Sequence, residues 1–285
     1  MQQFPTLEAP SHVDVTPRRI LGRTRGTGHG GITRLMSPSD IGHHLKPFVF
    51  LDLFSSEATL VRQMPVHPHS GIATITVITD GELIFDKPGW GRARIGYGGV
   101  EWMRAGSGVW HGDEMWPGAT RKITGYQLWI ALPPELEASD AEWQALEASD
   151  IPSVGPARLI MGQYGGERSP VRSPNGVNYL LLTLKAGEEF VYSPPEGHET
   201  AWLSVARGSL LAEARVAAGE LVVFEPGAEA IVLRGGDEGA TFVLGSAVPH
   251  PHDLVLGSYS VHTTPAALHA GEARIMEIRP RVPVA

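Results

Sequence analysis

Two histidines separated by one proline stand just before a long apolar run. His67 and His69 lead into residues 72–78, which are rich in isoleucine, threonine and valine. In a strand, residues i and i+2 point to the same face, so a rigid backbone can direct both imidazoles at one point. Imidazole binds Zn, Cu, Fe and Ni. The pair indicates a transition-metal site, whereas an isolated His-x-His pair would indicate only a surface loop.

A third histidine with neighbouring carboxylates extends this pair. His111 follows a predicted strand and a glycine turn, and Asp113 and Glu114 stand just after it. Because only two or three predicted strands separate the two motifs, a small barrel can bring the later strand back beside the first. The chain has no cysteine. Any metal must therefore be held by histidine and carboxylate side chains.

The composition predicts that strands position these residues. The chain has 285 residues, 42% of them hydrophobic, and its 34 glycines and 23 prolines separate short apolar runs. This spacing of turn residues favours an all-β sandwich or barrel. The segment Val205–Leu210 parallels Val77–Leu83, which indicates a degenerate internal repeat. We expect two barrels, an N-terminal one in residues 1–133 and a C-terminal one in residues 134–285.

The apolar runs also predict individual elements. Ser139 is a favourable N-cap residue followed by good helix formers, so the connector is expected to hold one short helix at residues 139–148. Strands are expected in the first half at residues 47–54, 72–79, 82–86 and 124–132, and in the second half at 157–161, 178–185, 200–206, 209–216, 221–224, 230–233 and 241–246.

The charge and the hydropathy of the chain argue against nucleic acids and membranes as binding partners. The formal net charge is −8 and no basic cluster is present, which argues against direct nucleic-acid binding. No apolar run is long enough to span a membrane. The segment Met1–Glu8 lacks the charged and apolar regions of a signal peptide. We expect a soluble, cytoplasmic protein.

These motifs together resemble the pirin family. The His-Pro-His-x-Gly sequence from His67 to Gly71, with its alternating strand ending in Gly-Glu, resembles the first cupin motif of pirins, and the resemblance extends over about residues 30–265. It implies a bicupin fold of two face-to-face barrels with one mononuclear metal, usually iron, in the N-terminal barrel. The other similar segments are Glu101–His111, Gln127–Trp129, Pro47–Asp52 and Tyr259–Thr263.

The resemblance implies three of the metal ligands and leaves the fourth open. His67, His69 and His111 match the family's histidines. The family's fourth ligand is a glutamate two residues after the third histidine, but this chain is one residue longer there. Glu114 keeps the family's Glu-Met pair and needs a bulge to turn inward, whereas Asp113 holds the i+2 position. We take Glu114 as the fourth ligand; Asp113, or water in a three-histidine site, are the alternatives.

The resemblance also implies a function. Pirins of this kind are linked to quercetin 2,3-dioxygenase activity, which suggests ring cleavage of a small flavonoid-like phenol at an iron centre. A divalent metal would favour loss of the phenolic proton. An uncoordinated Asp113 or Glu114 could act as general base. The alternative is a non-catalytic protein that senses metal or redox state and regulates a protein partner; a cupin isomerase or small-molecule binder is a weaker reading.

Other motifs are expected to be structural. The second His-Pro-His sequence, from His250 to His252, follows the last predicted strand and should be a surface loop. His198 lies near the matching strand of the second barrel without partner histidines, so that barrel should be metal-free. Trp102 and Trp110 could line the metal pocket, but they fit the barrel core better.

Overall fold

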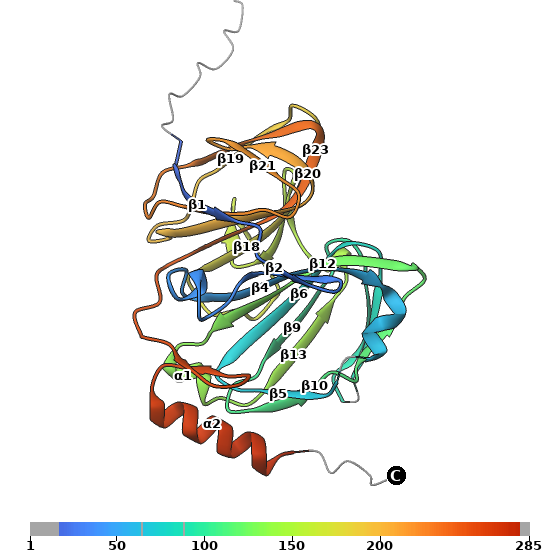
Figure 1. The fold of residues 1–285 in the computed structure, drawn as a ribbon, viewed down its shortest axis with the longest axis vertical. Coiled ribbons are helices and arrows are strands. Elements are labelled where there is room, and N and C mark those ends of the chain that lie inside the picture. The colour runs from blue at the N-terminus through green and yellow to red at the C-terminus, as the bar shows by residue number, and fades with distance from the viewer. Residues whose placement is uncertain (1–16, 64, 88, 280–285) are drawn as a thin grey trace, which may run out of the picture.

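The computed structural model describes residues 17–63, 65–87 and 89–279. Within them, two large antiparallel sheets face each other, and a third group of short strands curls around the first sheet (Figure 1). The expected all-β architecture is confirmed. The segment Met1–Glu8, where no signal peptide was recognised, lies outside the described residues. None of the helices in the described part of the chain is long and apolar enough to cross a membrane.

The first sheet is built almost entirely from the N-terminal half. Its seven strands, in spatial order, are β13 (Glu142–Leu146), β9 (Val100–Arg104), β6 (Ile72–Asp80), β12 (Lys122–Ala131), β4 (Phe48–Glu57), β3 (Ile32–Met36) and β2 (Thr27–His29). Two smaller sheets complete this half: β11 (Met115–Pro117), β7 (Leu83–Lys87) and β8 (Gly91–Ile95), and the pair β10 (Val109–His111) and β5 (His67–His69).

The second sheet has nine strands. Its main path is β1 (Ile20–Thr24), β22 (Leu221–Phe224), β20 (Thr200–Leu211), β23 (Ile231–Ala247), β18 (Val177–Leu184), β15 (Ala157–Met161) and β14 (Ser153–Val154), with β19 (Glu189–Tyr192) on β23 and β21 (Arg215–Ala217) on β20. The remaining elements are β16 (Gln163–Tyr164), β17 (Glu167–Arg168), β24 (Val255–Leu256), β25 (Val261–His262), α1 (Pro134–Glu137), α2 (Pro265–Glu277) and three 3₁₀ helices at Ile41–His43, Ala58–Gln63 and Ala148–Asp150.

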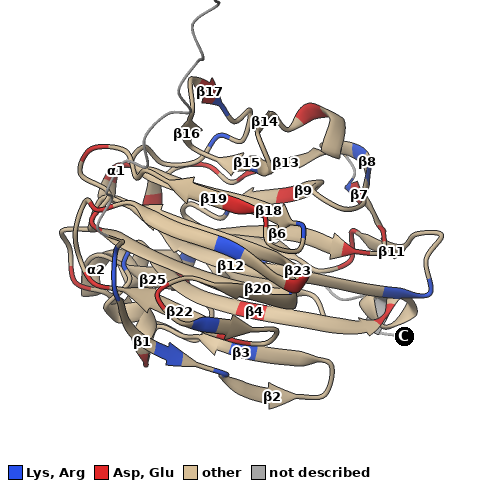
Figure 2. Cartoon of the chain, turned by 90° about the horizontal axis from the view of Figure 1, so that it is seen from above, with Lys and Arg blue, Asp and Glu red and all other residues tan. Residues whose placement is uncertain are grey.

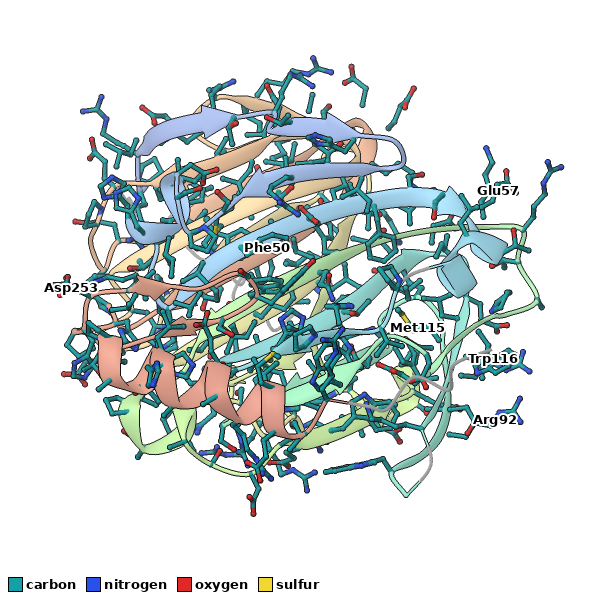
Figure 3. All side chains as sticks on the ribbon, turned by 60° about the horizontal axis from the view of Figure 1, so that its bottom comes forward. Phe50, Glu57, Arg92, Met115, Trp116 and Asp253 are labelled. Atoms are coloured by element: carbon teal, nitrogen blue, oxygen red, sulfur yellow. The ribbon has the colours of Figure 1, made fainter. Side chains whose placement is uncertain are left out.

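The two halves share one large apolar core. Ala73, Ile75 and Val77 alternate along β6 and pack into a cluster that also contains Trp202 of the second half. The side chains of the intervening residues, Thr74 and Thr76, point to the opposite face of the strand, as expected for period-two alternation. The same alternation is visible on β11, where Met115 lies within the fold and Trp116 projects outward (Figure 3). Alternation therefore separates the core between the halves from the interior of the first half.

The helix expected at residues 139–148 is wrong. Residues 142–146 form β13, which pairs antiparallel with β9, and Trp143 on this strand is buried. Burial of the indole and the hydrogen bonds of an otherwise open sheet edge outweigh a modest helix propensity. The short connecting helix is α1, slightly earlier in the chain. The longest helix of the described residues, α2, was not predicted.

Both ends of the described chain cross between the halves. β1 pairs with β22 of the second sheet, although it precedes every strand of the first. After β23 the chain returns to the first half, where α2 lies beneath β5 and β10 (Figure 1). The division of the chain between residues 133 and 134 stays a prediction. Strand pairing places β1 in the second sheet and β13 in the first, across that boundary. Charged residues of both signs are spread over many elements (Figure 2).

Candidate metal centre

The pair β5 and β10 brings the two histidine motifs together. In this antiparallel pair His111 lies opposite His67, and Val109 lies opposite His69. Because side chains alternate along a strand, His67 and His69 share one face and Pro68 takes the other. One ring nitrogen from each of the three histidines lies within 4.8 Å of those from the other two. The structure thus places all three predicted histidines in one cluster.

Each imidazole is oriented by an acceptor on its Nδ1 atom. The Nδ1 atom of His67 lies 2.9 Å from the carbonyl oxygen of Pro65, and that of His69 lies 2.8 Å from the carbonyl oxygen of Tyr259. The Nδ1 atom of His111 lies 3.0 Å from Oε1 of Glu114. Carbonyl and carboxylate oxygens only accept hydrogen bonds, so the three Nδ1 atoms donate. The lone pairs that remain are all on Nε2.

The residues present fit a bound transition metal. The Nε2 atoms of His69 and His111 are buried and have no hydrogen-bond partner, which is costly unless a ligand satisfies them. Burial lowers the pKa of His67, and it lowers the pKa of His69 well below its usual value, with the charge of His111 adding to both shifts. The neutral form is the one that binds a metal. Donation from Nδ1 to a carbonyl or carboxylate is the usual arrangement around metal-bound histidine.

Glu114 turns inward, but toward the Nδ1 side of His111. Gly112 has a φ of 126°, and a Cβ there would lie 2.8 Å from the carbonyl oxygen of Pro65. This glycine turn lets Oε1 of Glu114 reach His111 while Oε2 accepts the Gly112 amide at 2.8 Å. The two ring nitrogens of an imidazole point in different directions. Glu114 therefore lies outside the group of histidine nitrogens that could share a metal.

The two carboxylates after His111 have different surroundings. Burial alone would raise the pKa of Glu114, but the hydrogen bond and charge of His111, the charge of Lys87 and the Gly112 amide together hold it well below its usual range. The Nζ atom of Lys87 lies 3.9 Å from Oε2 of Glu114. Asp113, in contrast, is exposed. The geometry favours the alternative in which neither carboxylate is the fourth ligand.

Aromatic rings and a buried acid surround the histidines. The ring of Trp129 packs edge-on against His69, with centroids 4.8 Å apart, and stacks on Phe50. Glu101, on the neighbouring β9, accepts hydrogen bonds from Trp143 at 2.9 Å and from Thr76 at 3.1 Å. Burial raises the pKa of Glu101 to about 7. A carboxyl group that changes charge near neutral pH therefore lies close to the cluster.

A cavity of about 230 Å³ opens along the same side of the first sheet. Thr76 and Gln127, opposite each other on β6 and β12, give it polar groups, and Asp52 on β4 extends this polar row. Phe54, Leu83, Met115 and Ile123 are among its apolar walls. None of the three histidines is among the described residues that line it, so the cavity lies beside the cluster and does not enclose it.

Comparison with known proteins identifies the family. A family model described as Pirin matches residues 32–130. A Pseudomonas aeruginosa protein provisionally named a quercetin 2,3-dioxygenase is 31% identical over 192 residues, which cover 63% of this chain and 67% of that protein. The chain belongs to the pirin family.

Solved structures confirm the fold class expected for this family. The crystal structure of a quercetin 2,3-dioxygenase from Acinetobacter baumannii superposes with a TM-score of 0.78 at 24% identity, covering 91% of this chain and 96% of that one. A bacterial pirin from Escherichia coli, solved in complex with nickel(II), has a TM-score of 0.60 at 18% identity, covering 82% of this chain and 98% of that one.

The residues expected to be structural in this pirin lie away from the three histidines. Trp102 is fully buried in the core between the halves. The indole of Trp110 donates instead to the carbonyl oxygen of Ile275, 2.9 Å away. His198 is bonded to Ser246 in the second half. His250 is more buried than a surface loop suggests, since its Nε2 atom lies 3.3 Å from the carbonyl oxygen of Leu132.

Sequence reasoning missed three contributors to this centre. The carbonyl groups of Pro65 and Tyr259 have no side-chain signal, and the family resemblance marked Tyr259–Thr263 without giving that segment a role. Glu101 carried a detectable signal, because an acid at the start of a predicted strand, followed by Trp102, is a candidate for burial.

Substitution of the two carboxylates tests their roles. In this pirin, Glu114→Gln is expected to keep the metal but to weaken nickel(II) binding by about 10- to 100-fold, the usual cost of losing an orienting partner. Asp113→Ala is expected to leave the affinity unchanged. Competition with a chromophoric chelator measures both. Complete loss of bound metal in a folded Glu114→Gln protein would instead identify Glu114 as the fourth ligand.

Proposed function

We propose that this chain is a metal-dependent dioxygenase of the quercetin 2,3-dioxygenase type that acts on flavonoid-like phenols. The metal would be iron, and His67, His69 and His111 would hold it, with water as the further ligand. The observation that carries the proposal is the common orientation of the three imidazoles, in which every Nδ1 donates to an oxygen and every Nε2 is left for a ligand. The P. aeruginosa relative and the A. baumannii structure bear the name of this activity.

The chemistry follows from the donor set. Three neutral imidazoles would leave the positive charge of iron(II) uncompensated, and a metal held by them would favour loss of a phenolic proton. The chain's own residues keep this site rigid. Pro65, Tyr259 and Glu114 each accept a hydrogen bond from one Nδ1 atom, and the ionised Glu114 would make His111 a stronger donor to a metal. The ring of Trp129 covers one side of His69 and shields that side of the site from water.

The proton of the substrate needs an acceptor. Both oxygens of Glu114 already accept hydrogen bonds, so its role is to position His111. Asp113 is exposed beside it and is the candidate general base. If so, Asp113→Asn lowers kcat without lowering metal content. An unchanged kcat would contradict a role for Asp113 as the general base.

The identity of the metal has two candidates. Iron is proposed from the family resemblance, and the E. coli pirin was solved with nickel(II). Imidazole donors suit both ions. Elemental analysis after expression in medium that contains both metals distinguishes them, since the site should retain its physiological ion at near one per chain.

Turnover of quercetin tests the proposed reaction. Iron-loaded protein is mixed with quercetin without oxygen, and air is then admitted while the flavonol absorption band is followed. We expect loss of this band at a rate proportional to protein, and no loss with metal-free protein or with His111→Ala. Full iron occupancy without enzyme-dependent loss would contradict the dioxygenase. It would leave the alternative function, a metal- or redox-sensing regulator of a protein partner.

A further inference from the structure

The chain returns to the metal centre after it has completed the second sheet. Residues 255–277, here called the C-terminal strap, comprise β24, β25 and α2. Figure 1 shows the strap running down from the second half and α2 lying beneath β5 and β10, the two strands that carry the histidines. The strap therefore contacts the centre from the side opposite the second sheet.

One strap residue holds a candidate metal ligand directly. The carbonyl oxygen of Tyr259 lies 2.8 Å from Nδ1 of His69 and is the acceptor that fixes this ring. His69 has 0% exposure, so water cannot replace Tyr259 while the site stays closed. The ring of Tyr259 also lies near both histidines of β5, with centroids 5.8 Å from His67 and 6.1 Å from His69.

A second contact fixes the opposite strand. Trp110 precedes His111 on β10, and its indole donates to the carbonyl oxygen of Ile275 in α2 at 2.9 Å. Ile275 is buried, whereas its neighbour Met276 is 64% exposed. The helix thus uses one face to hold the strand that carries His111.

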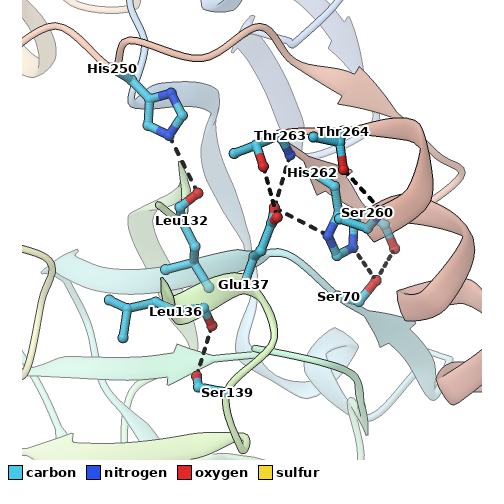
Figure 4. Close-up of polar contacts among 11 residues, drawn as sticks. Ser70, Leu132, Leu136, Glu137, Ser139, His250, Ser260, His262, Thr263 and Thr264 are labelled. Carbon is cyan, nitrogen blue, oxygen red and sulfur yellow. Dashed lines mark hydrogen bonds and ion pairs between the residues drawn. The ribbon is translucent and has the colours of Figure 1, made fainter. Parts of the chain in front are cut away.

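A buried polar network locks the strap in place (Figure 4). The Oγ atom of Ser70, next to His69, lies 2.9 Å from Nε2 of His262 and 2.9 Å from Oγ of Ser260. On the other side of the imidazole, Nδ1 of His262 lies 3.4 Å from Glu137. Glu137 also accepts from the amide and hydroxyl of Thr263, at 2.8 and 2.7 Å. The network joins the strap to α1 and to Ser70, the residue that follows β5.

This serine, histidine and glutamate resemble a hydrolytic triad in order but cannot serve as one. Ser70 has 0% exposure, so no substrate can reach its hydroxyl. A Cβ on Gly271 of α2 would lie 2.5 Å from Oγ of Ser70 and 2.6 Å from Nε2 of His262. The helix is therefore seated directly on the network, whose role is to hold the strap.

We propose that the C-terminal strap is a positioning part of the metal centre, so that strap docking and metal binding stabilise each other. The inference rests on the proposed metal site. Docking supplies the acceptor that turns Nε2 of His69 toward the ion. Binding at Nε2 in turn favours the state in which Nδ1 donates to Tyr259. Coupling of this kind is reciprocal, so each event changes the other by the same factor.

A matched pair of substitutions in α2 tests the coupling. Ile275→Asn places a polar amide on the buried face, whereas Met276→Asn makes the same change in charge and nearly the same change in size on the exposed face. We expect Ile275→Asn to weaken nickel(II) binding by about 10- to 100-fold, as for loss of an orienting partner. Met276→Asn should bind as the unchanged protein does.

The reciprocal effect is measured without activity. Nickel(II) should slow proteolytic cleavage within residues 255–277 of the unchanged protein, and slow it by a smaller factor in His69→Ala. Ile275→Ala, with its smaller loss of packing, serves if Ile275→Asn does not fold by circular dichroism. Equal nickel affinity in the buried-face and exposed-face variants would overturn the inference. Failure of the unchanged protein to bind nickel(II) or iron would instead overturn the proposed function.

Discussion

His69→Ala is expected to abolish stoichiometric metal binding. His69 is the most buried of the three histidines, and its buried Nε2 atom has no hydrogen-bond partner. Removing it leaves two ligands and also frees the carbonyl oxygen of Tyr259. The affinity should fall by more than the roughly 10- to 100-fold that loss of an orienting contact costs. Metal content after dialysis and titration with nickel(II) both measure the change.

A buried histidine in the second half provides the matched control. His198 has 5% exposure and donates to or accepts from Ser246 through Nδ1, so His198→Ala also removes a buried imidazole. It should bind metal as the unchanged protein does. Equal metal loss in both variants would show that the effect comes from unfolding. Full retention of bound metal in His69→Ala would contradict a centre formed by the three histidines.

Glu101→Gln is expected to stabilise the metal-free protein by about 3.5 kcal/mol at pH 8. Burial raises the pKa of Glu101 from 4.5 to about 7, and each unit corresponds to about 1.4 kcal/mol. Between these two values the folded state keeps a proton that the unfolded state has lost. Stability therefore falls as pH rises from about 4.5 to about 7, and the loss is complete above that range.

The glutamine variant should remove this pH dependence. Its side-chain oxygen can accept from Trp143 and its amide can donate to the Thr76 hydroxyl, as the protonated acid does. Urea unfolding at several pH values, with chelator present, gives the free energies. Glu135→Gln, at an exposed acid, should change them by less than about 0.5 kcal/mol. A Glu101→Gln profile parallel to that of the unchanged protein would contradict the assigned burial effect.

The three histidines could be predicted because their signal is local. Strand alternation fixes His67 and His69 on one face, and His111 needs only one return strand. The direction of Glu114 was harder to predict, because it depends on the glycine turn at Gly112. Its inward turn was foreseen, but its partner on His111 was not.

Other features depend on contacts between residues far apart in the chain. The acceptor for His69 is a main-chain carbonyl 190 residues away, and main-chain atoms are the same in every sequence. β13 was expected to be helical because its residues favour a helix locally, while the partner that decides its structure is β9. The alternation of the strands in the second half was regular enough to predict most of them, although two predicted runs merge into β23.

Because the strap is synthesised last of the described elements, the metal centre cannot be completed until late in translation. The three histidines emerge from the ribosome in the first half of translation, but Tyr259 emerges only after the whole second sheet. Until then, Nδ1 of His69 lacks this acceptor. Long sequence separation also makes this contact slow to form. We therefore expect the nascent chain to bind a metal about 10- to 100-fold more weakly until residues 255–277 have docked.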